Sequence, residues 1–192
     1  MRHLFFITLI TSILIIVPTA ETFAQRPIKR THYAHNAKHR KATRVHYKHR
    51  KYTNLPKWGA RVTKLHAKAS LIKWRNHNYY FHSGVYYSKI NNKYKIVRAP
   101  IGIRVAVLPS AATRVVVKLK PYYYYYGTFY VKQNDNSYET VNPPVGAKVE
   151  ILPDGLEEVE YNGETVYKLD DISFKPELTN DGKLVYEVIR TE

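Results

Sequence analysis

The sequence predicts an all-β protein made of three tandem modules, each a small β-sheet or barrel-like unit. A Gly–apolar–basic–Val–x–x–Leu motif occurs at residues 59–65, 102–108 and 146–152, at a spacing of 43 and then 44 residues. A proline lies two or three residues before each motif glycine. Between the motifs, short β-branched and aromatic segments alternate with turn residues, which is typical of strands. A fixed period of this length indicates a tandem array of one supersecondary unit.

The second repeat shows the expected strands most clearly. No window of a dozen residues has a 3.6-residue hydrophobic period, so no helix is predicted. Residues 62–74 of the first repeat resemble a helix in isolation, but their alignment with the other repeats favours strand. The strands expected in the second repeat are residues 103–108, 113–119, 122–126, 128–132 and 138–141.

Turn residues separate these segments. Asn162-Gly163 and Asp181-Gly182 favour type I′ hairpin turns, which need positive φ. Asn91-Asn92 and residues 134–136 tolerate the same conformation, although less well than glycine. The sequence therefore predicts hairpins at these four places.

The three repeats align position by position, and the shared columns are largely aromatic. A column shared by all repeats is expected to serve the common fold, whereas a column that differs is expected to serve function. The aligned sets are Tyr80, Tyr123 and Tyr167; Tyr87, Tyr130 and Phe174; Tyr94, Tyr138 and Tyr186; and Ile72, Val115 and Val159.

The N-terminal part of the chain differs from the repeats. A short basic segment, an apolar stretch and small residues before position 25 are typical of a signal peptide cleaved after Ala24. The apolar stretch is shorter than the ~20 residues that a membrane-spanning helix needs. We therefore expect export to the periplasm, the cell surface or the medium, with no transmembrane span after cleavage. The expected parts are residues 1–24 as signal peptide, 25–55 as a disordered Lys/Arg/His-rich arm, and 56–98, 99–142 and 143–192 as β repeats, the last acidic.

Charge is divided sharply along the chain. Residues 25–134 contain 25 Lys/Arg and no acid, whereas residues 135–192 contain 14 acids and 5 Lys/Arg, within a net charge of +16. Such a polarity concerns partners and association rather than the fold. No cysteine is present, so the fold depends on core packing without disulfides.

The basic arm is the predicted binding element. Clustered Lys/Arg attract polyanions by counterion release, so binding should weaken steeply with salt. Anionic envelope polymers and lipid headgroups fit this chemistry, and no dedicated nucleic-acid motif accompanies the arm; a solubilising tail without a ligand is the alternative. Five histidines lie in the arm without Cys, Asp or Glu, so no metal site is predicted. The candidate polyanion-binding residues are Arg26, Lys29, Arg30, Lys38, Arg40, Lys41, Arg44, Lys48, Arg50 and Lys51.

The tyrosine run at residues 122–126 places aromatic rings on both faces of one strand. Rings left exposed on one face would form an aromatic surface able to stack on sugars, with Tyr122, Tyr124 and Tyr126 as candidates. The alternative is that the rings fill the core and the contact with the adjoining repeat, because repeats bury their faces against neighbours.

Catalysis is not predicted. The first repeat has no carboxylate, and the second has only Asp135 and Glu139, so acid–base pairs have little to be built from. Nucleophile-elbow, phosphate-loop and zinc-protease motifs are missing from the sequence. No enzyme activity and no cofactor are therefore expected.

The Pro-Pro-Val-Gly at residues 143–146, the Leu-Pro pairs at 108–109 and 152–153, Asn162-Gly163 and the tyrosine run before Gly127 carry a family resemblance. With these motifs the chain resembles an uncharacterised family of exported Bacteroidota proteins with a Tyr/Gly/Pro-rich repeated domain of unknown function. The resemblance implies an envelope or extracellular location and supplies no activity or catalytic residues.

These observations favour a non-enzymatic exported envelope protein that binds anionic material through its basic arm. Two alternatives remain open at this point. One is a structural protein that self-assembles through contacts between basic and acidic repeats. The other is a carbohydrate-binding module that uses exposed tyrosines.

Overall fold

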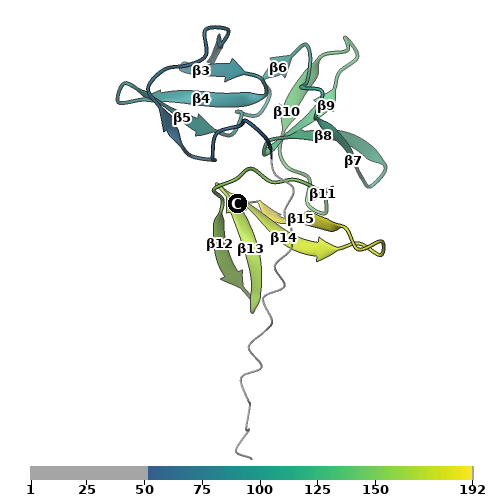
Figure 1. Ribbon diagram of the computed structural model, residues 1–192. Coiled ribbons are helices and arrows are strands. Elements are labelled where there is room, and N and C mark those ends of the chain that lie inside the picture. The colour runs from purple at the N-terminus through teal and green to yellow at the C-terminus, as the bar shows by residue number, and fades with distance from the viewer. Residues whose placement is uncertain (1–51, 192) are drawn as a thin grey trace, which may run out of the picture. The chain divides into compact units, whose positions relative to one another are not determined.

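The computed structural model describes residues 52–191, and these residues form three five-stranded sheets with no helix among them (Figure 1). All three sheets belong to one compact unit of the chain, residues 45–192. The all-β prediction is confirmed, and the repeats form three separate sheets rather than one continuous sheet. We call them modules 1, 2 and 3 in chain order.

Each module holds five strands. Module 1 contains β1 (Arg61–Val62), β2 (Ser70–Trp74), β3 (His77–His82), β4 (Val85–Ile90) and β5 (Lys93–Val97). Module 2 contains β6 (Arg104–Val105), β7 (Thr113–Val117), β8 (Lys120–Tyr125), β9 (Thr128–Lys132) and β10 (Tyr138–Val141). Module 3 contains β11 (Lys148–Val149), β12 (Glu157–Tyr161), β13 (Glu164–Leu169), β14 (Ile172–Leu178) and β15 (Leu184–Thr191).

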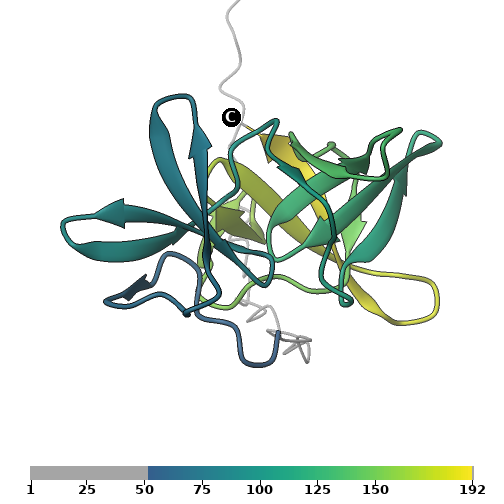
Figure 2. The ribbon, with the colours of Figure 1, turned by 90° about the horizontal axis from the view of Figure 1, so that it is seen from above.

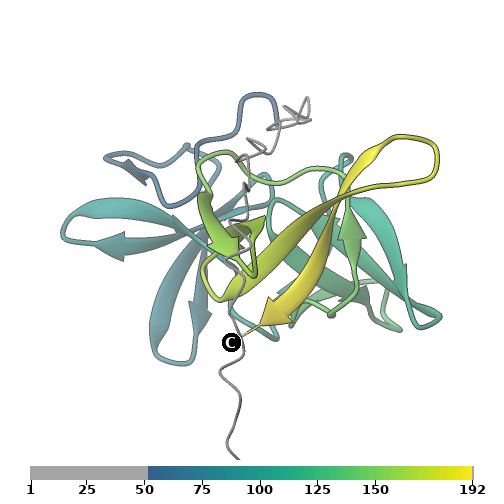
Figure 3. The same cartoon turned by 90° about the horizontal axis from the view of Figure 1, so that it is seen from below.

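The three sheets share one antiparallel topology. Their strand orders are β1-β5-β4-β3-β2, β6-β10-β9-β8-β7 and β11-β15-β14-β13-β12. The second to fifth strands of each module are joined in sequence by hairpins, and the fifth strand also pairs with the short first strand. Strand twist separates the tips of hairpins β2–β3 and β4–β5 in module 1 (Figure 2). The β14–β15 hairpin of module 3, yellow in Figure 3, has the longest strands, of 7 and 8 residues.

The expected strand bounds are largely right. In module 2, β9 and β10 coincide with the predicted residues 128–132 and 138–141. The predicted strand at 103–108 was too long, because only Arg104–Val105 pairs with β10 before the chain enters the loop that contains Pro109. The helix-like segment 62–74 forms no helix: it begins at the end of β1, turns within residues 63–69 and continues as β2, so the strand prediction from its alignment with the other repeats is confirmed for residues 70–74.

Two of the four predicted hairpin turns have two consecutive residues with positive φ, whereas the loop at residues 134–136 has positive φ only at Asn136. Asn162 and Gly163 both have positive φ, at 52° and 78°, and so do Asn91 and Asn92. The prediction of a type I′ turn at Asp181-Gly182 was wrong, because only Gly182 has positive φ. That loop closes with the Thr179 N–H on the Lys183 carbonyl, and the Gly182 N–H on the Thr179 carbonyl. A hairpin loop of three or more residues that ends in a left-handed residue needs positive φ at that one residue, whereas a type I′ turn needs it at two.

The aromatic columns occupy the same place in every module. Tyr80 packs edge-on against Tyr94 with ring centroids 5.0 Å apart. The aligned pair Tyr123–Tyr138 is T-shaped at 5.2 Å, and Tyr167–Tyr186 is T-shaped at 5.6 Å. The alignment of the repeats is therefore confirmed in three dimensions for these rings, and one T-shaped tyrosine pair recurs at the same place in each module.

Successive modules share cores. One buried cluster joins Val85, Tyr86 and Ile96 of module 1 to Tyr125 and Tyr130 of module 2. A second cluster joins side chains of module 2 to the core of module 3. Its buried members are Val115, Tyr124, Phe129, Ala147, Val149, Leu152, Leu169, Ile172, Phe174, Tyr186 and Val188. Burial of one module's apolar face against the next is how repeat units gain stability.

The segment that precedes module 1 packs against these cores. Tyr52 and Leu55 lie against the cluster shared by modules 1 and 2. The Tyr52 hydroxyl accepts a hydrogen bond from the Tyr126 N–H at 3.0 Å, and the Tyr126 hydroxyl donates to the Pro56 carbonyl. The Trp58 N–H donates to the Asp154 carbonyl at 2.7 Å. Tyr52 and Leu55, which the prediction assigned to the arm, therefore pack against the folded modules.

Candidate functional site

The ten predicted polyanion-binding residues, Arg26 to Lys51, lie outside the described residues, as does the expected signal peptide. The structure therefore bears on the folded modules, where three features matter: the tyrosine run, the cations of module 1, and a hollow on module 3.

The predicted aromatic surface is wrong at two of its three residues. Tyr124 and Tyr126 are only 1% and 2% exposed, and Tyr122 is partly buried against the core shared with module 3. Alternation along β8 sends Tyr124 toward module 3, whereas Tyr123 and Tyr125 pack in the cluster shared with module 1. Both faces of the run are used, because module 2 has a neighbour on each side. The run joins modules, and its buried rings are not a ligand surface.

Tyrosine hydroxyls in these cores serve packing rather than chemistry. The hydroxyls of Tyr130 and Tyr86 lie 3.5 Å apart across the contact between modules 1 and 2. Burial raises the pKa of Tyr86 to about 12 and raises the pKa of Tyr130 well above its ordinary value. Both groups therefore stay neutral at ordinary pH and act as uncharged hydrogen-bonding groups within an apolar contact.

The basic residue of the repeated motif differs in its partner between modules. In module 2, Arg104 lies opposite Glu139 on the neighbouring strand, and their side chains form an ion pair at 2.9 Å. In module 3, Lys148 lies opposite Glu187 and reaches it at 3.9 Å, with Glu177 closer at 2.5 Å. The hydrogen bond to Glu177 raises the pKa of Lys148. The motif cation is thus an ion-pair partner in two modules.

Module 1 breaks this pattern. Arg61 lies directly opposite Lys95, so two cations face each other across β1 and β5. Like charges at directly opposite positions destabilise a sheet, and an anion placed between them would relieve the repulsion. The Arg61–Lys95 pair was not predicted from the sequence. The residues that follow the aligned tyrosines 94, 138 and 186 are Lys95, Glu139 and Glu187. The change from acid to lysine at this repeat position is the feature by which the sequence could have indicated the pair.

Most other cations of module 1 also lack acidic neighbours. Within residues 52–191, Arg98 is the one cation of module 1 that forms an ion pair, with both guanidinium nitrogens on Asp171 at 2.7 and 3.1 Å. The remaining cations project from the strands and loops of a module that contains no carboxylate, and most of them are exposed. They are Arg61, Lys64, Lys68, Lys73, Arg75, Lys89, Lys93 and Lys95.

A hollow beside β4 and β5 of module 1 contains one of these cations. It measures about 410 Å³ and is lined by Lys95, Ser88 and Tyr79, but also by Asp170 of module 3. The Asp170 carboxylate accepts a hydrogen bond from the Trp58 indole at 3.3 Å. Because the hollow contains both signs of charge, it is not a dedicated anion pocket. The cations of module 1 without an acidic partner among residues 52–191 therefore lie mainly outside this hollow, on the exposed strands and loops.

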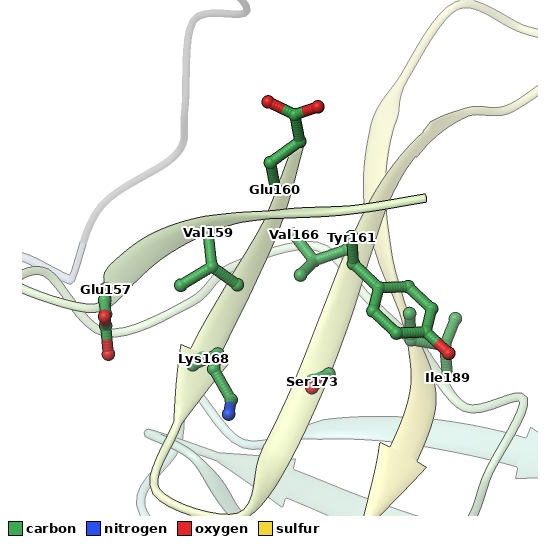
Figure 4. Close-up of a pocket in the computed structure, with 8 residues that line it drawn as sticks. All are labelled: Glu157, Val159, Glu160, Tyr161, Val166, Lys168, Ser173 and Ile189. Atoms are coloured by element: carbon green, nitrogen blue, oxygen red, sulfur yellow. The ribbon is translucent and has the colours of Figure 1, made fainter. Parts of the chain in front are cut away.

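Module 3 carries a second hollow of about 410 Å³ on the face formed by β12 to β15 (Figure 4). Apolar side chains of Val159, Val166, Tyr161 and Ile189 line it, and Figure 4 shows the Glu160 carboxylate pointing away from Val159 and Tyr161. Ser173, at 8% exposure, lies in its floor. At one end of the hollow, Glu157 lies opposite Lys168 across the two strands.

Among residues 52–191, no group of three or more His, Asp or Glu side chains is placed to hold a metal ion. The two nearest histidines, His66 and His82, stack with ring centroids 4.1 Å apart. Burial, and then the neighbouring His66, lowers the pKa of His82. This pair has no carboxylate of its own module beside it to complete a ligand set, since module 1 contains none.

None of the described residues forms a helix long and apolar enough to cross a membrane. The model of a family of unknown function (DUF6515) matches residues 15–192. No curated protein and no solved structure matches the chain.

Proposed function

The chain belongs to the DUF6515 family of unknown function, so we propose a function from the charges and contacts of its own residues. We propose that it is a non-enzymatic, exported envelope protein that binds anionic polymers or lipid headgroups. The basic arm, residues 25–51, and the acid-free surface of module 1 are the two binding elements of this proposal, each contributing through its own cations. Export, an origin in the Bacteroidota and a periplasmic or extracellular location are parts of this proposal.

The observation that carries the proposal is the Arg61–Lys95 pair. The same position holds an ion pair in modules 2 and 3, so the fold accommodates a carboxylate there. A lysine at this place in module 1 costs stability through repulsion and forms no ion pair with an acid among residues 52–191. A bound phosphate, sulfate or carboxylate group supplies the missing negative charge through charge-assisted hydrogen bonds.

The surroundings of the pair extend the positive surface. Module 1 follows directly on the arm in the chain, and residues 25–98 contain no acid. Uncompensated cations along one continuous stretch favour polyanions over single ions, since each contact releases a counterion. Neither the arm nor module 1 offers a base-reading motif, so the binding is governed by charge rather than sequence.

The test is binding of the chain from Gln25 onward to dextran sulfate and to vesicles of phosphatidylglycerol and phosphatidylcholine over a salt series. Arg61→Gln/Lys95→Gln should weaken binding and lower the salt slope by about 1 for each anionic group that the variant no longer neutralises. Removing the repulsion keeps or raises the stability of this variant, so weaker binding does not reflect unfolding. Arg114→Gln/Lys183→Gln is the control, because it changes net charge equally at sites elsewhere on the protein.

Removal of residues 25–51 should weaken binding further, and the deletion must stop before Tyr52 because that side chain packs in the core. Binding that is unaffected by both the deletion and the double substitution at Arg61 and Lys95 excludes the proposal. Binding to dextran sulfate without binding to vesicles would identify polymers rather than lipid headgroups as the ligand.

Self-assembly is a second candidate function, supported by the presence of an acid-free module 1 and an acidic module 3 in one chain. Basic and acidic ends favour head-to-tail contacts between copies, which need not close into a ring. Light scattering at low salt decides between the two functions, because a monomer under these conditions excludes self-assembly.

A further inference from the structure

One row of side chains crosses the outer face of module 1, which is the face on which module 2 packs. Residues directly opposite each other on neighbouring antiparallel strands project from the same face of a sheet. The successive partners of this row, from β3 through β4 and β5 to β1, are Tyr79, Ser88, Lys95 and Arg61. An aromatic ring, a hydroxyl group and two cations therefore follow one another across four adjacent strands.

Module 2 covers only part of this face. Phe81 and Tyr86 pack in the cluster shared with module 2. Tyr79, two residues before Phe81 on the same face of β3, is partly exposed and belongs to neither buried cluster of residues 52–191. Its side chain lines the hollow of about 410 Å³ together with Ser88 and Lys95. This volume lies within the range of ~300–1,000 Å³ that is usual for small-ligand sites.

The residue aligned with Tyr79 has a different role in each of the other modules. In module 2 it is Tyr122, which packs against the core shared with module 3. In module 3 it is Val166, which is 1% exposed. The fold therefore accepts a valine at this position. Only in module 1 does the position place an aromatic ring beside a hollow rather than in a core.

The charges around the hollow divide it into two parts. The Asp170 carboxylate lines the hollow and would repel a phosphate or sulfate group placed inside it. Lys95 lies at the other part, where it faces Arg61. The anionic group of a ligand is therefore held by these two cations, and an uncharged part of the ligand lies in the hollow. There Ser88 and Asp170 can bond to hydroxyl groups, and the ring of Tyr79 offers an apolar face.

We infer that module 1 binds an acidic polysaccharide in which a neutral sugar adjoins an acidic one. The neutral ring stacks on Tyr79 in the hollow, and the acidic group of the adjoining sugar lies between Lys95 and Arg61. Neighbouring strands are about 4.8 Å apart, so Tyr79 and Lys95, two strands apart, are separated by roughly 10 Å across the sheet. Two linked sugars span this distance, whereas a lone phosphate group reaches only the cations. This inference rests on the proposed function and names the ligand class of its cation pair.

The experiment is an NMR titration of the chain from Gln25 onward at low salt, following the backbone amide signals of β3, β4 and β5, so that binding by the arm does not obscure the result. The probes are a hyaluronan tetrasaccharide, which alternates neutral and acidic sugars, and tripolyphosphate, which has charge but no sugar. Tyr79→Val removes the ring without changing charge and introduces the residue that module 3 has at this position. It should weaken binding of the tetrasaccharide about fivefold and leave binding of tripolyphosphate unchanged.

Two variants serve as controls. Tyr79→Phe keeps the ring, so its affinity for the tetrasaccharide should stay within about twofold of the native value. Tyr161→Ala removes a tyrosine that is 47% exposed on module 3 and does not line this hollow, so both affinities should be unchanged.

Equal affinity of the native chain and Tyr79→Val for the tetrasaccharide overturns the inference. The proposed function survives that result if Arg61→Gln/Lys95→Gln still weakens binding of tripolyphosphate. A native chain that binds neither probe contradicts the proposed function as well. Tighter, Tyr79-dependent binding of a soluble short-chain phosphatidylglycerol also overturns the inference, because the ligand of this site would then be a lipid.

Discussion

Replacing Tyr124 by alanine tests the central claim that tyrosines of module 2 join the modules. The ring is 1% exposed and lies in the cluster that module 2 shares with module 3, 4.9 Å from the ring of Phe129. Truncation of a buried aromatic side chain to alanine costs about 3–5 kcal/mol. A domain of this kind has a total stability of about 5–15 kcal/mol, so the variant folds but gives up a large share of its stability.

Urea denaturation followed by tryptophan fluorescence measures this change, and a fall in Tm of roughly 10 °C should accompany it. Tyr161→Ala is the control, because that ring is 47% exposed on module 3 and its removal should cost less than about 1 kcal/mol. A cost below about 1 kcal/mol for Tyr124→Ala would refute the buried placement of the ring and return it to the candidates for an exposed surface.

Three further predictions concern turns and pH. Gly84→Ala should lower the free energy of unfolding by about 2–4 kcal/mol in chemical denaturation, because residue 84 has a φ of +81° and an added Cβ would collide with the ring of Tyr125. Gly163→Ala is the control and should cost only about 1 kcal/mol, because its φ of +78° is similar but the space around it is open. Leu119 is 95% exposed at a φ of 64°, so Leu119→Gly should raise the free energy of unfolding by up to about 1 kcal/mol in the same assay; a decrease would contradict the strained turn. Burial lowers the pKa of His82 below 6.5, so the unfolded chain binds the proton more readily and the free energy of unfolding falls as pH decreases through about 6.5. His82→Gln should remove part of that fall between about pH 7.5 and about pH 5. An unchanged dependence of stability on pH would contradict this prediction.

Much of the fold was predictable because it is recorded locally. Positive φ at Asn162-Gly163 and Asn91-Asn92 depends on residues that tolerate that conformation, so the turns could be identified from neighbouring residues alone. The Asp181-Gly182 turn was misassigned because loop length, which depends on strand register, selects the turn type. The candidate site was harder to predict from the sequence than the fold. The opposition of Arg61 and Lys95 joins residues 34 positions apart, and its meaning emerges only by comparison with the ion pairs of modules 2 and 3.

The sequence by itself determined the three-module all-β architecture and its aromatic columns, because a repeat period and a two-residue side-chain alternation are local properties. Tertiary structure alone decided which face of each strand is covered. Alternation divides residues 122–126 into two faces but does not say that both are buried, which follows from module 2 having a neighbour on each side. The same reason explains the hollow on module 3. Its outer face has Ser173 where the other modules have rings, and no further module among residues 52–191 packs against it.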